Sequence, residues 1–168
     1  SAVQLIAGTV GTLPLVVYER LATGGRVRAT QHRTWAMLHE APNPEMAADE
    51  LWELVTAQLC LWGNAFLFKE RDGLGLVTAL WPLRPDAVQV ARNPENSRER
   101  VFIVNGAPYT ETDILHIRAM SRDGLVGYSP VQLAKEAIAN ALAQERFQGK
   151  FMANGARPSI ILRHPQRL

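Results

Sequence analysis

Apolar residues recur with a helical period over residues 47–62. At about 100° per residue, these apolar positions cover roughly half of the helix circumference. Asp49, Glu50 and Glu53 lie on the other side, near the N-terminus, where the helix dipole favours carboxylates. Because the apolar arc is wider than a surface helix needs, we expect a helix between a sheet and another element. An arc that partly faces a second subunit is the alternative. The apolar positions are Leu51, Trp52, Leu54, Val55, Leu59, Leu61 and Trp62.

A second long helix is predicted over residues 130–153. Ser129 is a good N-cap, and Pro130 fits the first helical position because proline needs no hydrogen-bond acceptor there. Asn154-Gly155 is a left-handed C-cap signal. Polar residues interrupt the apolar stripe of its second half, so we expect that half to leave the domain's own core.

Between these helices the pattern changes to short β-rich runs separated by turn residues. Their close spacing favours an antiparallel meander over βαβ units. The predicted strands are 64–71, 76–83, 87–92, 100–104 and 113–118, with turns at 71–73, 93–97 and 105–109.

The two ends of the chain carry weaker patterns. Residues 1–7 are predicted to form the last turns of a helix that ends at Gly8. Residues 13–20 and 26–29 are predicted to form the two strands of a hairpin, and residues 31–40 are predicted to form a short helix. Residues 158–168 resemble a strand without a partner, so we expect the chain to be a fragment of something longer.

Length and composition are those of a folded globular chain. The 168 residues correspond to one domain, and 47% hydrophobic with 20% charged residues argues against disorder. No apolar run approaches the roughly 18 residues of a transmembrane helix. The single cysteine, Cys60, has no internal disulfide partner and is interpreted as a small structural residue.

Candidate catalytic groups are few. Asp113 and His116 could form an acid–base or metal pair, but strand residues three apart point to opposite faces. We therefore interpret His116 as a hydrogen-bonded core residue, and a small hydrolase built on this pair remains a competing hypothesis. The GxG at Gly73 and Gly75 lacks the third glycine of a dinucleotide loop and is interpreted as a hairpin turn. No P-loop, HExxH or CxxC occurs, and we predict no cofactor and no metal.

The charge of the chain is close to balanced, at +2, and its basic residues are interpreted as scattered rather than run together. A nucleic-acid-binding module is nevertheless the alternative function. Its phosphate contacts would be Arg118, Arg122, Arg146 and Lys150.

Several segments, in order and with matching spacing, resemble the portal proteins of long-tailed bacteriophages. Together they cover nearly the whole chain. They are 13–20, 41–46, 59–73, 80–90, 113–118, 123–141 and 151–162.

The resemblance implies a structural subunit and no enzymatic activity. Portal proteins form a ring, typically of twelve copies, at one capsid vertex, where the terminase pumps double-stranded DNA through the channel and the head later joins the tail. The implied partners are further copies of the chain, terminase, capsid and head–tail adaptor proteins, and no membrane. Little direct DNA contact is expected from this part, and the location is the virion, after assembly in the host cytoplasm.

The resemblance matches only the N-terminal, wing part of the family, without stem, clip and crown. We therefore predict a single α+β domain over residues 1–168, with a mainly antiparallel, curved sheet packed against helices 47–62 and 130–153. Turn and cap residues are expected to carry structural roles rather than chemistry. They are Asn43, Pro44, Gly63, Asn64, Gly127, Ser129, Pro130, Asn154 and Gly155.

Overall fold

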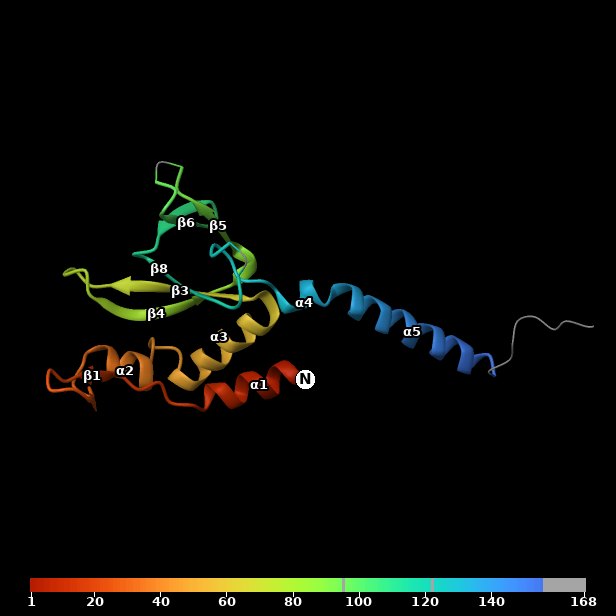
Figure 1. Ribbon diagram of the computed structural model, residues 1–168, viewed down its shortest axis with the longest axis horizontal. Helices are drawn as coiled ribbons and strands as arrows, with labels where there is room; N and C mark the ends of the chain where they lie inside the picture. The colour runs from red at the N-terminus through yellow and green to blue at the C-terminus, as the bar shows by residue number, and fades with distance from the viewer. Residues whose placement is uncertain (95, 122, 156–168) are drawn as a thin grey trace, which may run out of the picture. The chain divides into compact units, whose positions relative to one another are not determined.

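The computed structural model describes residues 1–94, 96–121 and 123–155 (Figure 1). The chain divides into two compact units, Ser1–Gln132 and Leu133–Leu168. The single domain expected over the whole chain stays a prediction. The strand predicted at 158–168 lies outside the described residues.

The described residues of the first unit form helices and three small antiparallel sheets, which confirms the predicted α+β class. The sheets have the strand orders β1-β2, β4-β3-β8 and β5-β6-β7. The helices are α1 (Ala2–Gly11), α2 (Thr34–His39), α3 (Ala48–Trp62), the short 3-10 helix η1 (Pro85–Ala87) and α4 (Pro130–Leu133). The strands are β1 (Tyr18–Arg20), β2 (Arg26–Arg28), β3 (Asn64–Arg71), β4 (Val77–Leu83), β5 (Val88–Arg92), β6 (Arg100–Val104), β7 (Ala107–Thr110) and β8 (Ile114–Arg118).

Strand β3 is central because it is apolar on both faces. Successive strand side chains point to opposite sides, so Ala65 and Leu67 pack on α3, while Phe66 and Phe68 face the sheet β5-β6-β7. Figure 1 shows α3 below the sheet β4-β3-β8 and strands β5 and β6 above it. Two hydrophobic cores, one on each face of β3, therefore hold the first unit together.

Helix α3 lies between that sheet and α1, as the wide apolar arc predicted. Gly11 at the end of α1 is buried, and a Cβ there would stand 2.9 Å from the Asp49 carbonyl oxygen and from the Glu53 Cβ. The two helices thus approach closely at this point. At the start of α3, the Glu50 carboxylate accepts a hydrogen bond from the Ala47 N–H at 2.9 Å.

Three local expectations are corrected. Gly8 does not end the first helix, which continues to Gly11, because a glycine inside a helix costs only about 1 kcal/mol and the packing of α1 on α3 offsets it. Residues 105–109 are not only a turn. Asn105 and Gly106 make the turn with positive φ values of 50° and 85°, and β7 begins directly after them.

The third correction concerns the predicted helix 130–153, which is interrupted. Ala134 has φ −92° and ψ 5°, and it separates α4 from α5 (Lys135–Ala153). Helical periodicity did not reveal this break, because a single residue leaves the helical conformation while the apolar spacing continues. The described part of the second unit is essentially α5. Among the described residues, no helix is both long and apolar enough to cross a membrane.

Candidate functional site

Gly63 and Gly127 bring two distant segments into backbone contact, which we call the Gly63–Gly127 junction. Gly63 ends α3 in the left-handed conformation, with φ 71°, and its N–H donates to the Leu59 carbonyl at 3.0 Å. A Cβ on Gly63 would stand 1.8 Å from the Tyr128 carbonyl oxygen, and one on Gly127 would stand 2.0 Å from the Gly63 carbonyl oxygen. Only glycine fits at either position.

The side chain of Asn64 pairs with Gly127 as a peptide group would. Its Oδ1 accepts from the Gly127 N–H at 2.7 Å, and its Nδ2 donates to the Gly127 carbonyl at 2.9 Å. Nδ2 also donates to the Trp62 carbonyl at 3.0 Å. The amide therefore satisfies backbone groups of both segments at once, which holds residues 127–129 against the end of α3.

Ser129 performs two tasks. Its hydroxyl donates to the Leu61 carbonyl at 2.7 Å and accepts from the Gln132 N–H at 3.2 Å. It therefore caps the first turn of α4 and attaches that turn to α3. Pro130 stands at the first position of α4.

The loop before α3 is fixed by a buried asparagine. The Asn43 side chain is 4% exposed; Nδ2 donates to the Leu80 carbonyl of β4 at 2.8 Å, and Oδ1 accepts from the Glu45 N–H at 2.9 Å. Pro44 is exposed. In the second unit, Gly155 follows α5 with φ 71°, and the Asn154 N–H donates to the Lys150 carbonyl at 3.1 Å.

His116 connects the junction to the core. Its ring stacks on Phe66 with centroids 4.4 Å apart and meets Phe102 edge-on at 5.6 Å. Nε2 lies 2.9 Å from Asn64 Oδ1. Because that oxygen can only accept, the proton belongs on Nε2. His116 is thus the hydrogen-bonded core residue that its position in the sequence indicated.

Burial keeps His116 neutral at pH 7. Desolvation, together with the nearby charges of Arg100 and Arg118, lowers the pKa of His116 to about 4, against a smaller opposing effect of Glu111. Nδ1 is buried and has no hydrogen-bond partner. A proton on Nδ1 would therefore be held without an acceptor, in agreement with the low pKa.

Asp113 and His116 have separate partners. Asp113 accepts from the Thr110 N–H at 3.0 Å and from its hydroxyl at 2.9 Å, and these bonds lower the pKa of the Asp113 carboxyl. Cys60 is a free, partly buried thiol. Within the described ranges, no group of three or more His, Cys, Asp or Glu side chains could hold a metal ion.

The described basic contacts predicted from sequence belong to two different units. Arg118 belongs to β8 in the first unit, Arg146 and Lys150 belong to α5 in the second, and Arg122 lies outside the described residues. Sequence analysis missed a different group of arginines, on the hairpin β1–β2. Counting charges in a sliding window, rather than looking for adjacent basic residues, would have found it.

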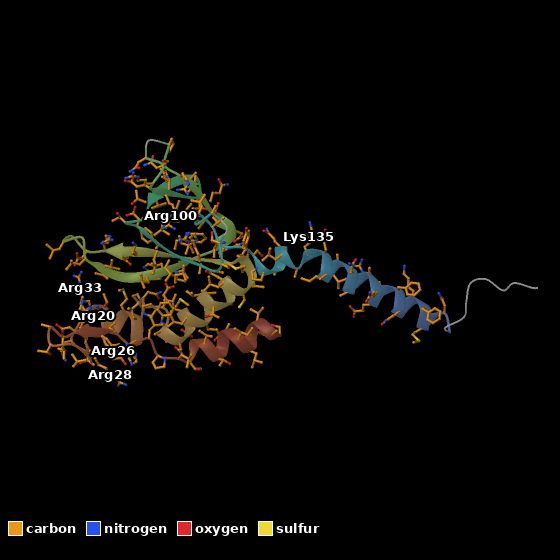
Figure 2. All side chains as sticks on the ribbon, viewed as in Figure 1. Arg20, Arg26, Arg28, Arg33, Arg100 and Lys135 are labelled. Carbon is orange, nitrogen blue, oxygen red and sulfur yellow. The ribbon has the colours of Figure 1, made fainter. Side chains whose placement is uncertain are left out.

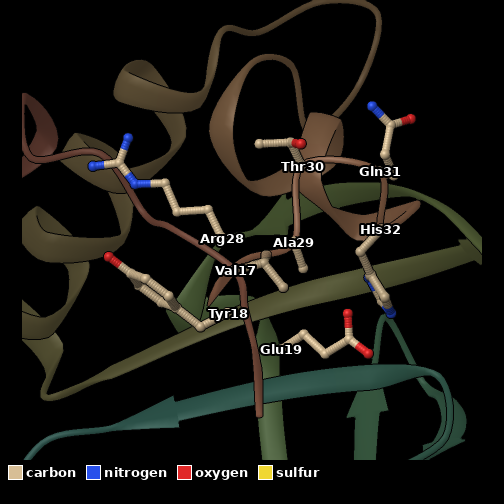
Figure 3. Close-up of a pocket in the computed structure, with 8 residues that line it drawn as sticks. All are labelled: Val17, Tyr18, Glu19, Arg28, Ala29, Thr30, Gln31 and His32. Carbon is tan, nitrogen blue, oxygen red and sulfur yellow. The ribbon is translucent and has the colours of Figure 1, made fainter. Parts of the chain in front are cut away.

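A hollow of the first unit lies beside that hairpin. It encloses about 600 Å³ and is open to solvent (Figure 3). Figure 3 shows Tyr18 and Arg28 next to each other, while Glu19 points toward His32. Its lining residues are Val17, Tyr18, Glu19, Arg28, Ala29, Thr30, Gln31 and His32.

Known proteins match this chain along most of its length. The portal protein of Enterobacteria phage HK97 is 33% identical over 164 residues, which cover 95% of this chain and 38% of that protein. The probable portal protein of Streptomyces phage phiC31 is 30% identical over 177 residues, which cover 98% of this chain and 38% of that protein. This chain therefore spans about two fifths of the length of these relatives.

Solved structures share the fold. A chain in the neck of an empty GTA (gene transfer agent) particle has a TM-score of 0.72 and 26% identity, over 94% of this chain and 43% of that one. An HK97 family phage portal protein from Corynebacterium diphtheriae has a TM-score of 0.63 over 91% of this chain and 46% of that one. Its 16% identity is low, so this likeness shows the fold alone. The family model described as phage portal protein matches residues 1–168, and the chain therefore belongs to the phage portal protein family.

Proposed function

We propose that this chain is the wing-like, N-terminal part of a portal subunit. In this proposal, copies of the subunit form a ring at one capsid vertex, through which terminase drives double-stranded DNA. The ring later joins capsid and head–tail adaptor proteins within the virion. Family membership over the whole chain carries this proposal.

The fold suits a rigid building block. Both faces of β3 are buried. The close backbone contacts at Gly63 and Gly127 and the side-chain hydrogen bond of Asn64 to Gly127 fix the segment that follows β8. A ring that must hold its shape while DNA passes needs such rigidity. Asn43, Pro44, Gly63, Asn64, Gly127, Ser129, Pro130, Asn154 and Gly155 are proposed to serve this shape and no reaction.

The role of His116 further supports a structural protein. A general base must reach the proton that it removes. Here Nε2 is occupied by Asn64, and Nδ1 is buried. We therefore propose that the subunit has no catalytic activity, and that the hydrolase hypothesis fails at this geometry. The relatives likewise favour a portal over the separate nucleic-acid-binding module.

Electron microscopy of the full-length protein tests the proposal. We expect closed rings with a central hole. A protein that stays monomeric at micromolar and higher concentrations, in both low and moderate salt, would contradict it. Mass photometry of the same sample would give the number of copies.

A further inference from the structure

The net positive charge of the chain is concentrated in the hairpin region. Residues 18–33 contain four arginines (Arg20, Arg26, Arg28 and Arg33) and one acidic residue, Glu19. This segment therefore carries a formal charge of +3, more than the +2 of the entire chain. Figure 2 shows these four arginines gathered at one end of the first unit.

Strand pairing places three of the arginines on one face. In the register of β1 and β2, Tyr18 stands opposite Arg28, and Arg20 stands opposite Arg26. Residues two apart on a strand share a face, so Tyr18, Arg20, Arg26 and Arg28 all point to the same side. We call these four residues the arginine face. Glu19 belongs to the opposite side of the ribbon, in agreement with Figure 3.

This arrangement costs stability in the isolated chain. Like charges directly opposite on paired strands repel each other, and Arg20 and Arg26 are such a pair. Among the described residues, the ion pairs are Arg84–Asp86 and Arg100–Glu111, and neither involves the face. All four side chains of the face are exposed. A bound anion would relieve the repulsion, whereas nothing inside the hairpin does.

The chemistry of the face matches phosphates along a duplex. Guanidinium groups bind phosphate oxygens through two parallel hydrogen bonds, and a two-stranded β-ribbon fits the major groove of DNA. The Arg26 guanidinium lies 5.0 Å from the centre of the Tyr18 ring, which holds it in place at the surface. We propose that the arginine face binds the phosphate backbone of double-stranded nucleic acid.

This surface differs from the basic contacts predicted from sequence, and it does not depend on ring assembly. An acidic protein segment is the other anionic partner that the face could accept. The two-stranded hairpin favours the duplex, because such a ribbon fits the major groove of DNA and its arginines can pair with phosphate oxygens.

Fluorescence anisotropy with a labelled 30-base-pair DNA duplex tests the proposal. At 50 mM salt, the variant R20Q/R26Q/R28Q should bind at least tenfold more weakly than the unchanged chain. Three phosphate contacts predict that the logarithm of the binding constant falls by roughly 2.7 per tenfold rise in salt, and the variant should lose most of this dependence. Its melting temperature should be unchanged or higher, because the repulsion is removed.

The matched control is R118Q/R146Q/K150Q, which removes the same charge from exposed positions elsewhere. It should retain binding to within about threefold. Three results would overturn the proposal: no duplex binding at 50 mM salt, an equal loss in the control variant, or equally tight binding of a labelled polyglutamate peptide. The last result would assign the face to an acidic protein partner.

Discussion

Gly63 shows how one residue can depend on two constraints at once. It has a positive φ, which costs other residues about 1–2 kcal/mol, and its missing side chain leaves room for the Tyr128 carbonyl. We expect Gly63→Ala to lower the free energy of unfolding by about 2 to 4 kcal/mol. Urea denaturation measures this loss.

Gly106 provides the matched control. It has a φ of 85° but nothing within 4 Å of an added Cβ. Gly106→Ala should therefore cost only the backbone contribution, about 1 kcal/mol. Equal losses at the two positions would show that the close contact at Gly63 has no energetic weight.

Burial of His116 predicts a pH-dependent stability. The pKa falls from 6.5 to about 4 on folding, so the unfolded chain binds the additional proton between these values. The contribution of neutral His116 to the free energy of unfolding is fully present above pH 6.5 and is lost as the pH falls toward 4. Because the ring is only partly buried, we discount the shift and expect a loss of about 1 to 2 kcal/mol.

His116→Gln should remove this contribution. The difference in unfolding free energy between the unchanged chain and the variant should shrink as the pH falls from 7 to 4. Urea denaturation at several pH values measures it. Parallel curves for the two proteins would contradict the assigned pKa.

At the scale of elements, β3 is the strand on which both cores depend. Leu67 is fully buried between β3 and α3. Leu67→Ala should destabilise the first unit by about 2 to 5 kcal/mol, since it removes buried methyl groups and leaves a cavity. Leu74→Ala, at a side chain that is 85% exposed, should change the stability little. Thermal unfolding followed by circular dichroism compares them.

The contact of α1 with α3 gives a second prediction at this scale. Gly11→Ala would place a Cβ 2.9 Å from α3 backbone and side-chain atoms. The helices must separate to accept it, at a cost of about 1 to 3 kcal/mol. Gly149→Ala in α5, where nothing lies within 4 Å, should instead stabilise its helix slightly. Hydrogen exchange should show faster opening of α1 in Gly11→Ala but not in Gly149→Ala.

For the whole molecule, the apolar side chains of α5 bear on assembly. Phe147 and Met152 are each 70% exposed in the described structure, although both are large and apolar. If neighbouring copies cover them in a ring, Phe147→Ser with Met152→Ser should reduce the ringed fraction of the full-length protein. Leu74→Ser removes a comparably exposed apolar side chain from a hairpin turn and should leave rings intact. Rings of unchanged abundance in the double variant would exclude this contact.

The sequence alone determined the features that arise from local physics. The helix 47–62 and five strands between residues 64 and 118 follow from periodicity and from turn residues, and their bounds agree closely with α3, β3 to β6 and β8. Strand β7 was expected as part of a turn. The ordered segments, taken together, identified the family. Local signals also predicted the helix end at Gly63 and the N-cap at Ser129, because both depend on the backbone conformation of neighbouring residues.

Only the tertiary structure decided what each of these residues contacts. The pairing of Asn64 with Gly127 joins residues 63 positions apart, and His116 is kept neutral by rings from β3 and β6. The arginine face arises from strand register, since Arg20 and Arg26 become neighbours only when β1 and β2 pair. Such contacts depend on which distant segments pack together, and a local pattern carries no information about that choice.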